Sequence, residues 1–251
     1  MPFISIVIPV YNSEKTIIGS LKSVFNQTYS DYEVIVVNDG STDTSIDLIS
    51  QNFKNEISVG RLTIINQVNQ GVSTARNCGM KNSKGEFIAF LDSDDQWMSN
   101  KLERVLPHLS KGYAFYAHNW CLSQALHSTE QKKNKELTFY EVLLRNPVVT
   151  PSVVFKNTQS YFFDDSIRFA EDHELWLRML NKNKAYFIDE TLTILGRRPL
   201  TKGGLSGNKL KMRLGEMNMY FIAAKYRRVL IPSLPFLLVY SFLKHCIKIF
   251  R

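Results

Sequence analysis

The chain has 251 residues, 44% of them hydrophobic, and a formal net charge of +8 at pH 7. This length and composition predict a full buried core, in one large domain or one and a half. The cysteines (Cys78, Cys121 and Cys246) are scattered and odd in number, which argues against a disulfide scaffold or a zinc site and favours a reducing compartment.

The positive charge is concentrated at the C-terminal end. Residues 1–200 contain 21 Lys and Arg against 22 Asp and Glu, whereas residues 201–251 contain ten basic residues and the single acid Glu216. A nucleic-acid partner would require these cations to be interleaved with stacking aromatics or set on a recognition helix. Here they flank apolar runs, so we expect an anionic membrane surface and no nucleic acid as the partner.

Through the first 95 residues, continuous apolar runs alternate with segments whose apolar residues recur at helical spacing (helical stripes). The N-terminal run lacks the basic region and cleavage site of a signal peptide, so it is predicted to be a strand. The predicted strands cover 4–8, 33–37, 62–65 and 87–91, and helical stripes lie between them, at 13–25, 46–53 and 71–80. This order predicts a parallel, doubly wound α/β sheet that binds its ligand at the carboxyl ends of the strands.

Polar clusters follow three of these strands, at residues 11–12, 38–40 and 92–94. They would collect along one edge of the sheet, as a binding cleft requires. The turn after the first strand has neither the GxGxxG pattern nor a Walker A loop, which excludes the NAD-binding alternative. A nucleotide would therefore be held by side chains and a metal.

Three carboxylates, Asp92, Asp94 and Asp95, lie within four positions after the fourth strand. Residues two apart in extended backbone point the same way, so Asp92 and Asp94 can converge. Crowded carboxylates repel one another, and hard oxygen ligands suit Mg²⁺ or Mn²⁺ holding substrate phosphates. The alternative is a solvated acidic turn that caps a helix over 99–109.

A second acidic site begins the predicted helix over 170–180. Glu171 and Glu174 fall on its polar face, whereas Asp172 falls with Trp176 on the apolar side. A carboxylate on a buried face needs a partner or a role, so Asp172 is a candidate general base. The alternative is an acid favoured by the helix dipole.

Residues 113–165, less regular in pattern, are expected to supply acceptor contacts.

The paired arginines Arg197 and Arg198 precede a glycine-rich loop that runs to Ser206. Such a loop would suit a lid that closes on a diphosphate. The alternative is an ordinary basic surface loop.

The last part of the chain holds an apolar run of 15 residues, 229–243, that contains Pro232 and Pro235. A membrane-spanning helix needs about 20 apolar residues, so a single crossing is not expected. Basic residues bracket the run, which predicts helices lying in the headgroup region of a membrane. The alternative is helices packed on the domain or in a dimer interface.

Five motifs together resemble the inverting GT-A glycosyltransferases of family 2. They are Ser-Ile-Val-Ile-Pro-Val-Tyr-Asn (5–12), Val-Asn-Asp-Gly-Ser-Thr-Asp (37–43), Gly-Val-Ser-Thr-Ala-Arg-Asn-Cys-Gly (71–79), Phe-Leu-Asp-Ser-Asp-Asp (90–95) and Glu-Asp-His-Glu-Leu-Trp-Leu-Arg (171–178). Each motif alone is weak, but five in the family's order are specific.

The resemblance implies a GT-A domain over residues 1–206, with a Rossmann-like, doubly wound and mostly parallel sheet. Its nucleotide-binding half would be 1–95 and its acceptor half 96–206. Residues 207–251 would then form a basic amphipathic helical tail that contacts a membrane surface or another protein chain.

The resemblance also assigns nucleotide-sugar binding to Pro9, Tyr11, Asp39, Arg76, Asp92, Arg197 and Arg198. Among these, Asp39 would bind the base, and Asp92 would lie near the ribose or sugar. Asp94 and Asp95, in or beside a match to the family's DXD motif, would hold Mn²⁺ or Mg²⁺, and Asp172 matches the catalytic base. Many relatives carry a histidine where Arg198-Pro199 stands, so an arginine is expected to take over its contact with phosphate or metal.

The implied activity is metal-assisted, inverting transfer of a hexose or N-acetylhexosamine from a UDP-sugar to a hydroxyl of a glycan or lipid-linked glycan. We expect it in bacterial surface-glycan assembly, on the inner face of the cytoplasmic membrane, and leave homo-oligomerisation open. One alternative is an inactive nucleotide- or glycan-binding module of the same fold. A nucleotidyltransferase would more usually show a glycine-rich loop after the first strand, and a glycoside hydrolase would not explain a nucleotide-like cleft with a metal cluster.

Overall fold

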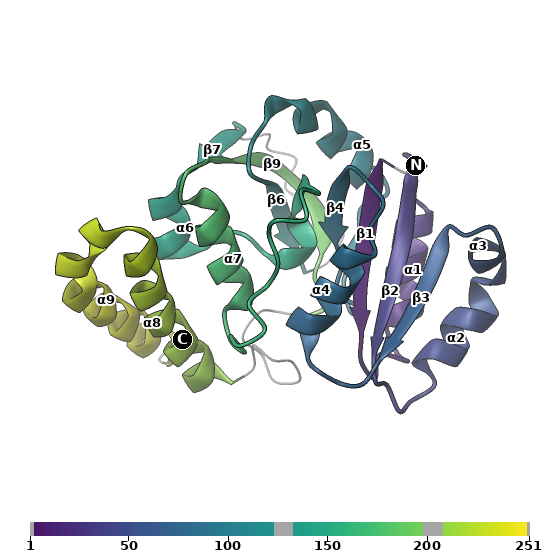
Figure 1. Cartoon of the computed structure of the whole chain (residues 1–251), viewed down its shortest axis with the longest axis horizontal. Helices are drawn as coiled ribbons and strands as arrows, with labels where there is room; N and C mark the ends of the chain where they lie inside the picture. Colours follow the sequence, from purple (N-terminus) through teal and green to yellow (C-terminus); the bar gives the residue numbers. More distant parts are fainter. Residues whose placement is uncertain (1–2, 123–132, 198–207, 250–251) are drawn as a thin grey trace.

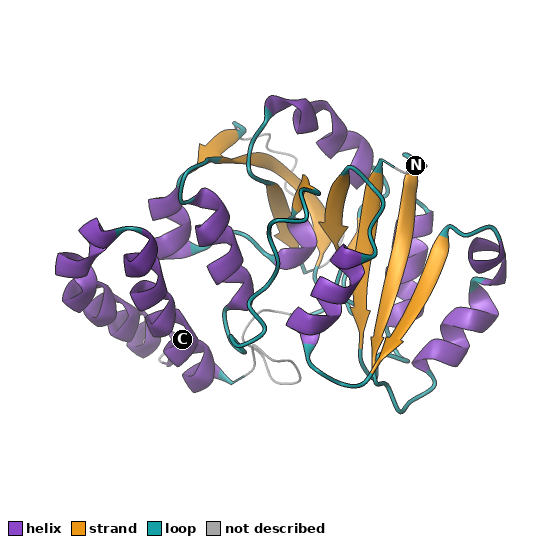
Figure 2. Ribbon diagram, in the orientation of Figure 1, coloured by secondary structure: helices purple, strands orange, loops and turns teal. Residues whose placement is uncertain are grey.

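The structure is a computed structural model that describes residues 3–122, 133–197 and 208–249. Its centre is a nine-stranded sheet with helices on both faces, and the C-terminal helices extend the molecule at one end (Figures 1 and 2). The predicted α/β class is confirmed.

The strands are β1 (Ile4–Val10), β2 (Tyr32–Asp39), β3 (Leu62–Gln67), β4 (Phe87–Phe90), β5 (Gln96–Trp97), β6 (Tyr116–Cys121), β7 (Lys135–Leu137), β8 (Val154–Lys156) and β9 (Ala185–Ile194). The α-helices are α1 (Ile17–Phe25), α2 (Ser45–Asn52), α3 (Lys54–Ser58), α4 (Val72–Lys81), α5 (Lys101–Val105), α6 (Phe139–Arg145), α7 (Glu171–Leu180), α8 (Lys209–Tyr226) and α9 (Leu234–Ile249). Short 3₁₀ turns lie at Leu106–Lys111, Thr150–Ser152 and Arg228–Ser233.

The strand order is β3-β2-β1-β4-β8-β6-β9-β5, and β7 pairs with β9. The strands of the first half, β1 to β4, pair in parallel, as their alternation with helices predicts. The second half is mixed, because β8 joins β4 and β6 antiparallel while β6 and β9 are parallel. The predicted parallel nucleotide half thus continues into a mixed half.

The sheet is buried on both faces, which explains its continuous apolar strands. Every residue of β1 is buried. Its even-numbered isoleucines belong to the core cluster that includes α1 and α5, and Val7 belongs to the cluster that includes α7 on the opposite face. Helix α4 comes close to β1 because residue 79 is glycine: a Cβ there would lie 2.3 Å from a Val7 methyl carbon.

The helix predicted over residues 99–109 is shorter than expected. Helix α5 ends at Val105, and the chain continues as the 3₁₀ turn Leu106–Lys111. Pro107 has no N–H to donate to the preceding helical turn, so the regular α-helical ladder cannot continue through it.

The C-terminal tail packs on the rest of the protein through α8. Tyr220 and Ala223 of α8 are 0% exposed and join the core cluster that contains α6 and α7. Arg227 then donates to the Asn181 carbonyl oxygen at 2.7 Å, and its guanidinium lies 4.1 Å from the ring centroid of Phe139. Helix α8 therefore packs on the domain, as the alternative interpretation of the tail predicted.

One prediction about α7 is wrong as a result. Glu171 and Glu174, predicted to lie on the polar face of the helix, are only 9% and 2% exposed. The reason lies far along the chain, because Tyr226 at the end of α8 donates a hydrogen bond to Glu174. Asp172, placed on the apolar side, is partly exposed.

Helix α9 keeps a second, outward apolar face. Phe236, Val239 and Phe242 are 78%, 58% and 61% exposed, whereas Leu237 on the inward side is buried. Within the described residues, no helix is both long and apolar enough to span a bilayer, in agreement with the length of the apolar run.

Candidate active site

The candidate site lies where β1, β2 and β4 end. Val10 pairs with Asn38, and Val7 pairs with Phe90, so these parallel strands end close to one another. Tyr11, Asp39 and Asp92 therefore share the edge of the sheet that the sequence pattern predicted. Pro9 lies buried within β1, just before this edge.

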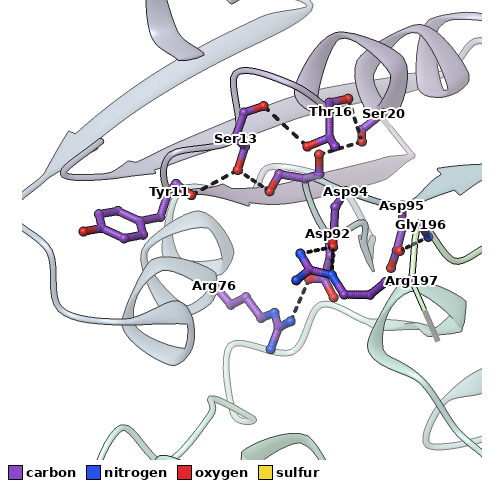
Figure 3. A network of polar contacts seen from close by, with 11 residues as sticks. Tyr11, Ser13, Thr16, Ser20, Arg76, Asp92, Asp94, Asp95, Gly196 and Arg197 are labelled. Carbon is purple, nitrogen blue, oxygen red and sulfur yellow. Dashed lines mark hydrogen bonds and ion pairs between the residues drawn. The ribbon is translucent and has the colours of Figure 1, made fainter. Parts of the chain in front are cut away.

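Asp39 organises the turn between β3 and α4. One of its carboxylate oxygens accepts from the Gln67 amide and the Gln70 backbone N–H, and the other accepts from the Gly71 N–H, all at 2.8 Å. Asp39 is only 4% exposed. Tyr11, in contrast, is 52% exposed, and its ring points away from the aspartates (Figure 3). An exposed aromatic face above an ordered turn offers a surface on which a base can stack.

The acidic turn after β4 is held on one side by α1 and the loop before it. The Ser13 and Ser93 hydroxyl oxygens are 2.7 Å apart, and the Ser20 hydroxyl donates to the Ser93 carbonyl oxygen at 2.9 Å. The backbone N–H of Asp95 closes the turn onto the Asp92 carbonyl oxygen at 3.1 Å. The carboxylates of Asp92 and Asp95 therefore start from a fixed backbone.

The segment after β9 covers the same turn from the other side. Arg197 Nε donates to Asp94 Oδ2 at 2.6 Å, and the Gly196 N–H donates to Asp95 Oδ1 at 2.9 Å. Residue 196 must be glycine for this approach, because a Cβ there would lie 1.9 Å from the Asp94 carbonyl oxygen. Burial, and then the charge of Asp92, raise the pKa of Asp95 to about 8.

Arg76 of α4 links the acidic turn to α7. Its guanidinium donates to Asp92 Oδ1 at 2.7 Å and to Glu171 Oε1 at 3.3 Å. Arg76 is 4% exposed and also lies over the Phe163 ring, 5.3 Å from its centroid. Burial, and then the charge of Asp172, raise the pKa of Glu171 to about 7. A single buried cation thus brings the second acidic site next to the first (Figure 3 draws its contact with Asp92).

Asp172 occupies the first turn of α7. Its Oδ1 accepts from the His173 backbone N–H at 2.7 Å, and its Oδ2 accepts from the Thr150 hydroxyl at 3.4 Å. The residue before the helix, Ala170, has a left-handed backbone with φ of 61°, an uncommon conformation for a residue with a side chain. The carboxylate is partly exposed and can therefore meet a substrate hydroxyl.

Thr150 is itself held by a buried polar cluster. The carbonyl oxygen of Pro151 accepts from Trp97 Nε1 at 2.9 Å, Lys101 Nζ at 3.4 Å and the Thr193 hydroxyl at 3.3 Å. These donors come from β5, α5 and β9, so three elements fix the short turn that carries Thr150. This support was not predicted from the sequence, where residues 113–165 were difficult to interpret.

The structure therefore brings together Arg76, Asp92, Asp94, Asp95 and Arg197, with Asp172 one residue from the same network. Arg198, also predicted to bind the donor, lies outside the described residues, as does most of the glycine-rich loop after it. Glu171, a buried partner of Arg76, was not predicted from the sequence. The only signal was its position beside Asp172.

Within the described residues, no group of three or more acids, histidines or cysteines is arranged to hold a metal ion, so the fit of a divalent cation rests on the chemistry of the carboxylates after β4. Asp92, Asp94 and Asp95 supply hard oxygen ligands of the kind that Mn²⁺ and Mg²⁺ prefer. Two arginines already balance this cluster, and the raised pKa of Asp95 reflects carboxylates crowded in a buried place. A bound cation would relieve the same repulsion.

Comparison with known proteins identifies the family of the chain. The model of the family "Glycosyl transferase family 2" matches residues 5–151. The chain is 31% identical over 230 residues to an uncharacterized glycosyltransferase of Rickettsia bellii, covering 89% of this chain but only 33% of that protein. The chain thus spans about a third of the length of this relative.

Two Escherichia coli relatives have more similar lengths. They are the UDP-Glc:alpha-D-GlcNAc-diphosphoundecaprenol beta-1,3-glucosyltransferases WfgD and WfaP. WfgD is 33% identical over 212 residues, covering 83% of this chain and 81% of WfgD. WfaP is 29% identical over 257 residues, covering 98% of this chain and 96% of WfaP.

Solved structures share the fold at low sequence identity. Staphylococcus aureus TarS in complex with UDP is 19% identical with a TM-score of 0.66, covering 89% of this chain and 70% of that one. A Pyrobaculum calidifontis mannosyltransferase in complex with GDP-Man and Mn²⁺ is 16% identical with a TM-score of 0.71, covering 96% and 73%. These similarities confirm the predicted GT-A fold, and together with the family match they show that the chain belongs to glycosyl transferase family 2, a family of sugar-transferring enzymes.

Proposed function

We propose that the protein transfers a hexose or N-acetylhexosamine from a UDP-sugar to a hydroxyl of a glycan or lipid-linked glycan, inverting the anomeric centre. The observation that carries this proposal is the bridge made by Arg76 between Asp92 and Glu171. It sets the acidic turn for the donor beside the helix that carries Asp172. A transferase needs these two sites next to each other.

The donor would occupy the edge where β1, β2 and β4 end. Tyr11 would stack on the base, and the turn ordered by Asp39 would lie against it, with Pro9 forming part of the wall. Asp92 would face the ribose or sugar, with its carboxylate held in place by the ion pair with Arg76. Arg197, now paired with Asp94, and the neighbouring Arg198 would exchange this contact for the diphosphate.

Asp94 and Asp95 would hold the divalent cation, which would supply electrostatic stabilisation to the departing diphosphate. Mn²⁺ is present in the similar mannosyltransferase structure, and the donor set here is compatible with Mn²⁺ or Mg²⁺. Arg197 and Arg198 would add positive charge on the same leaving group.

Asp172 would act as the general base. Its carboxylate takes the proton of the acceptor hydroxyl as that oxygen forms a bond to the anomeric carbon. The bond from that carbon to the diphosphate oxygen breaks, and its electron pair leaves with UDP. A single displacement inverts the centre, so an α-linked donor gives a β-linked product. The name of the relative WfaP states a beta-1,3 linkage for glucose taken from UDP-Glc.

Glucose and a GlcNAc-diphosphate lipid are the first donor sugar and acceptor to test, because two relatives bear these substrates in their names. We propose that the protein reaches such an acceptor from the inner surface of a bacterial cytoplasmic membrane. The outward face of α9, with Phe236, Val239 and Phe242, and the nearby exposed Lys225 and Arg228 support this placement.

The test is a transfer assay with UDP-glucose, Mn²⁺ and a GlcNAc-diphosphate lipid, with products identified by mass spectrometry. We expect a sugar-extended acceptor and free UDP from the wild-type protein, and none without the metal. Other UDP-sugars and GlcNAc glycosides form the second arm. If UDP binds but no donor is consumed with any acceptor, the alternative of an inactive nucleotide-binding module replaces the proposal.

A further inference from the structure

A cavity of about 640 Å³ lies beside α7, between the loop 164–169 and α8. Figure 1 shows this loop and the first turns of α8 side by side. Their close approach depends on Gly215, because a Cβ there would lie 2.8 Å from the Phe169 carbonyl oxygen. The volume is that of a site for a small organic ligand. The loop leads into α7, which begins at Glu171, one residue before the proposed base Asp172. Glu174 of the same helix lines the cavity.

Three cations line this cavity from different parts of the chain: Arg168 from the loop, and Lys211 and Lys225 from α8. Two acids, Asp164 and Glu174, also line the cavity. Glu174 accepts from Arg178 Nε at 2.8 Å and from the Tyr226 hydroxyl, and Asp164 accepts from the Ser166 hydroxyl at 2.6 Å. The three cations outnumber the two acids, one of which is paired with Arg178, so the lining carries a net positive charge that suits an anion.

The same cavity has an apolar side that continues onto the surface. Ile167, Leu214 and Ile222 line it. Leu210, Leu214 and Phe221 are 62%, 57% and 47% exposed, and their spacing sets them along one side of α8. An anionic ligand with an attached apolar chain would satisfy both parts, with its charge on the cations and its chain along α8.

We propose that this groove binds the diphosphate and the first part of the lipid chain of a lipid-linked acceptor, an inference that rests on the proposed function. Arg168, Lys211 and Lys225 contact the phosphate oxygens, and the apolar stripe of α8 receives the chain. The acceptor sugar is then directed past the start of α7, towards Asp172.

Direct binding tests this assignment without turnover. The probe is GlcNAc joined through a diphosphate to a short prenyl chain, and the comparison ligand is the GlcNAc glycoside of the same chain without the diphosphate. Arg168→Gln, Lys211→Gln and Lys225→Gln are each expected to weaken probe binding by about fivefold to tenfold, as loss of one charge-assisted contact does. Affinity for the neutral glycoside and for UDP with Mn²⁺ stays unchanged. Lys182→Gln, an exposed lysine just beyond α7, is the matched control and leaves probe binding unchanged.

Several results would overturn the assignment: equal probe affinity in all variants, an equal loss for the neutral glycoside, or displacement of the probe by anionic vesicles as effectively as by unlabelled probe. The last result would make the groove a general site for anionic lipid. Transfer that proceeds with unchanged acceptor KM in the three variants contradicts the groove and leaves the proposed function standing. Probe binding that depends on the three cations, in a protein that transfers no sugar, supports the groove and contradicts the proposed function.

Discussion

Glu171 is the buried residue whose charge most affects the junction of the two acidic sites. Its pKa is raised to about 7 by burial and then by Asp172, and is partly restrained by Arg76. The folded state therefore keeps a proton that the unfolded chain releases near its ordinary value of 4.5. As the pH rises from 4.5 to 7, the free energy of unfolding loses this contribution.

We predict that Glu171→Gln removes this dependence. Relative to the wild type, the variant should gain about 2 kcal/mol in free energy of unfolding between pH 4.5 and pH 7. Urea denaturation at both pH values measures it. Glu190→Gln, at a surface carboxylate paired with Arg104, is the control and should follow the wild type. Parallel curves for Glu171→Gln and the wild type would show that Glu171 ionises normally.

Thr150 is the residue that orients the proposed base, through the hydroxyl contact to Asp172 at 3.4 Å. Thr150→Val removes this donor without changing the size of the side chain much. We expect kcat to fall by about fivefold to tenfold, as for one hydrogen bond to a charged group, with UDP affinity unchanged. Thr150→Ser keeps the hydroxyl and should keep most of the rate. Equal rates in all three proteins would remove Thr150 from the mechanism.

At these positions the sequence predicts some contacts and not others. Asp92, Asp94 and Asp95 follow a buried strand directly, so local pattern was enough to identify a charged cluster at the sheet edge. Their partners Arg76 and Arg197 come from distant segments. The paired arginines before the glycine-rich loop already suggested a diphosphate contact for Arg197, whereas only the family resemblance connected Arg76 with the site. The burial of Glu171 and Glu174 depends on elements far along the chain, which helical periodicity within α7 does not reveal.

Helix α5 contains a lysine where an apolar residue would be expected. Lys101 is 0% exposed, its Nζ lies 3.2 Å from the centroid of Trp97, and burial lowers its pKa well below the ordinary value. His118 is fully buried as well, and burial, then Lys101, lower its pKa to about 3. The folded protein thus keeps His118 neutral near pH 7 and releases the Lys101 proton at a lower pH than the unfolded chain, which keeps it until about pH 10.4.

We predict that Lys101→Met changes how stability depends on pH. For the wild type, the unfolded state binds the additional proton, so its free energy of unfolding rises with pH by up to about 1.4 kcal/mol per unit relative to the variant. Urea denaturation at pH 7 and pH 9.5 tests this rise. A constant difference between the two proteins would mean that Lys101 stays charged in the folded state, held by the Trp97 ring.

The tail helices show what an apolar pattern leaves undetermined. The run over 229–243 predicted a surface element, but it did not distinguish the side that packs from the side that remains open. Leu230 and Leu237 join the core that includes α7, whereas Phe236 and Phe242 are exposed. Packing against α8 decides between them. For this reason truncation at residue 228 would uncover the core as well as remove a membrane contact.

For the whole molecule, we predict that the outward face of α9 holds the protein on anionic membranes. Phe236→Ser with Phe242→Ser should reduce flotation with anionic vesicles by at least about tenfold, because each phenylalanine contributes about 1.5–3 kcal/mol when buried in an apolar environment. Val59→Ser, at a residue that is 69% exposed after α3, is the control and should float like the wild type. Unchanged flotation of the double variant would rule out this face as the membrane contact.

In the proposed mechanism, Asp172 serves the chemical step and Asp94 serves the donor. The direct measurement is the rate of sugar transfer at saturating UDP-sugar, acceptor and Mn²⁺, made together with UDP affinity, for the wild type, Asp172→Asn and Asp94→Ala. We predict that Asp172→Asn binds UDP with Mn²⁺ like the wild type but transfers at least about a hundredfold more slowly, as loss of a general base implies. Asp94→Ala should lose the metal-dependent part of UDP binding. A wild-type rate from Asp172→Asn would contradict the account.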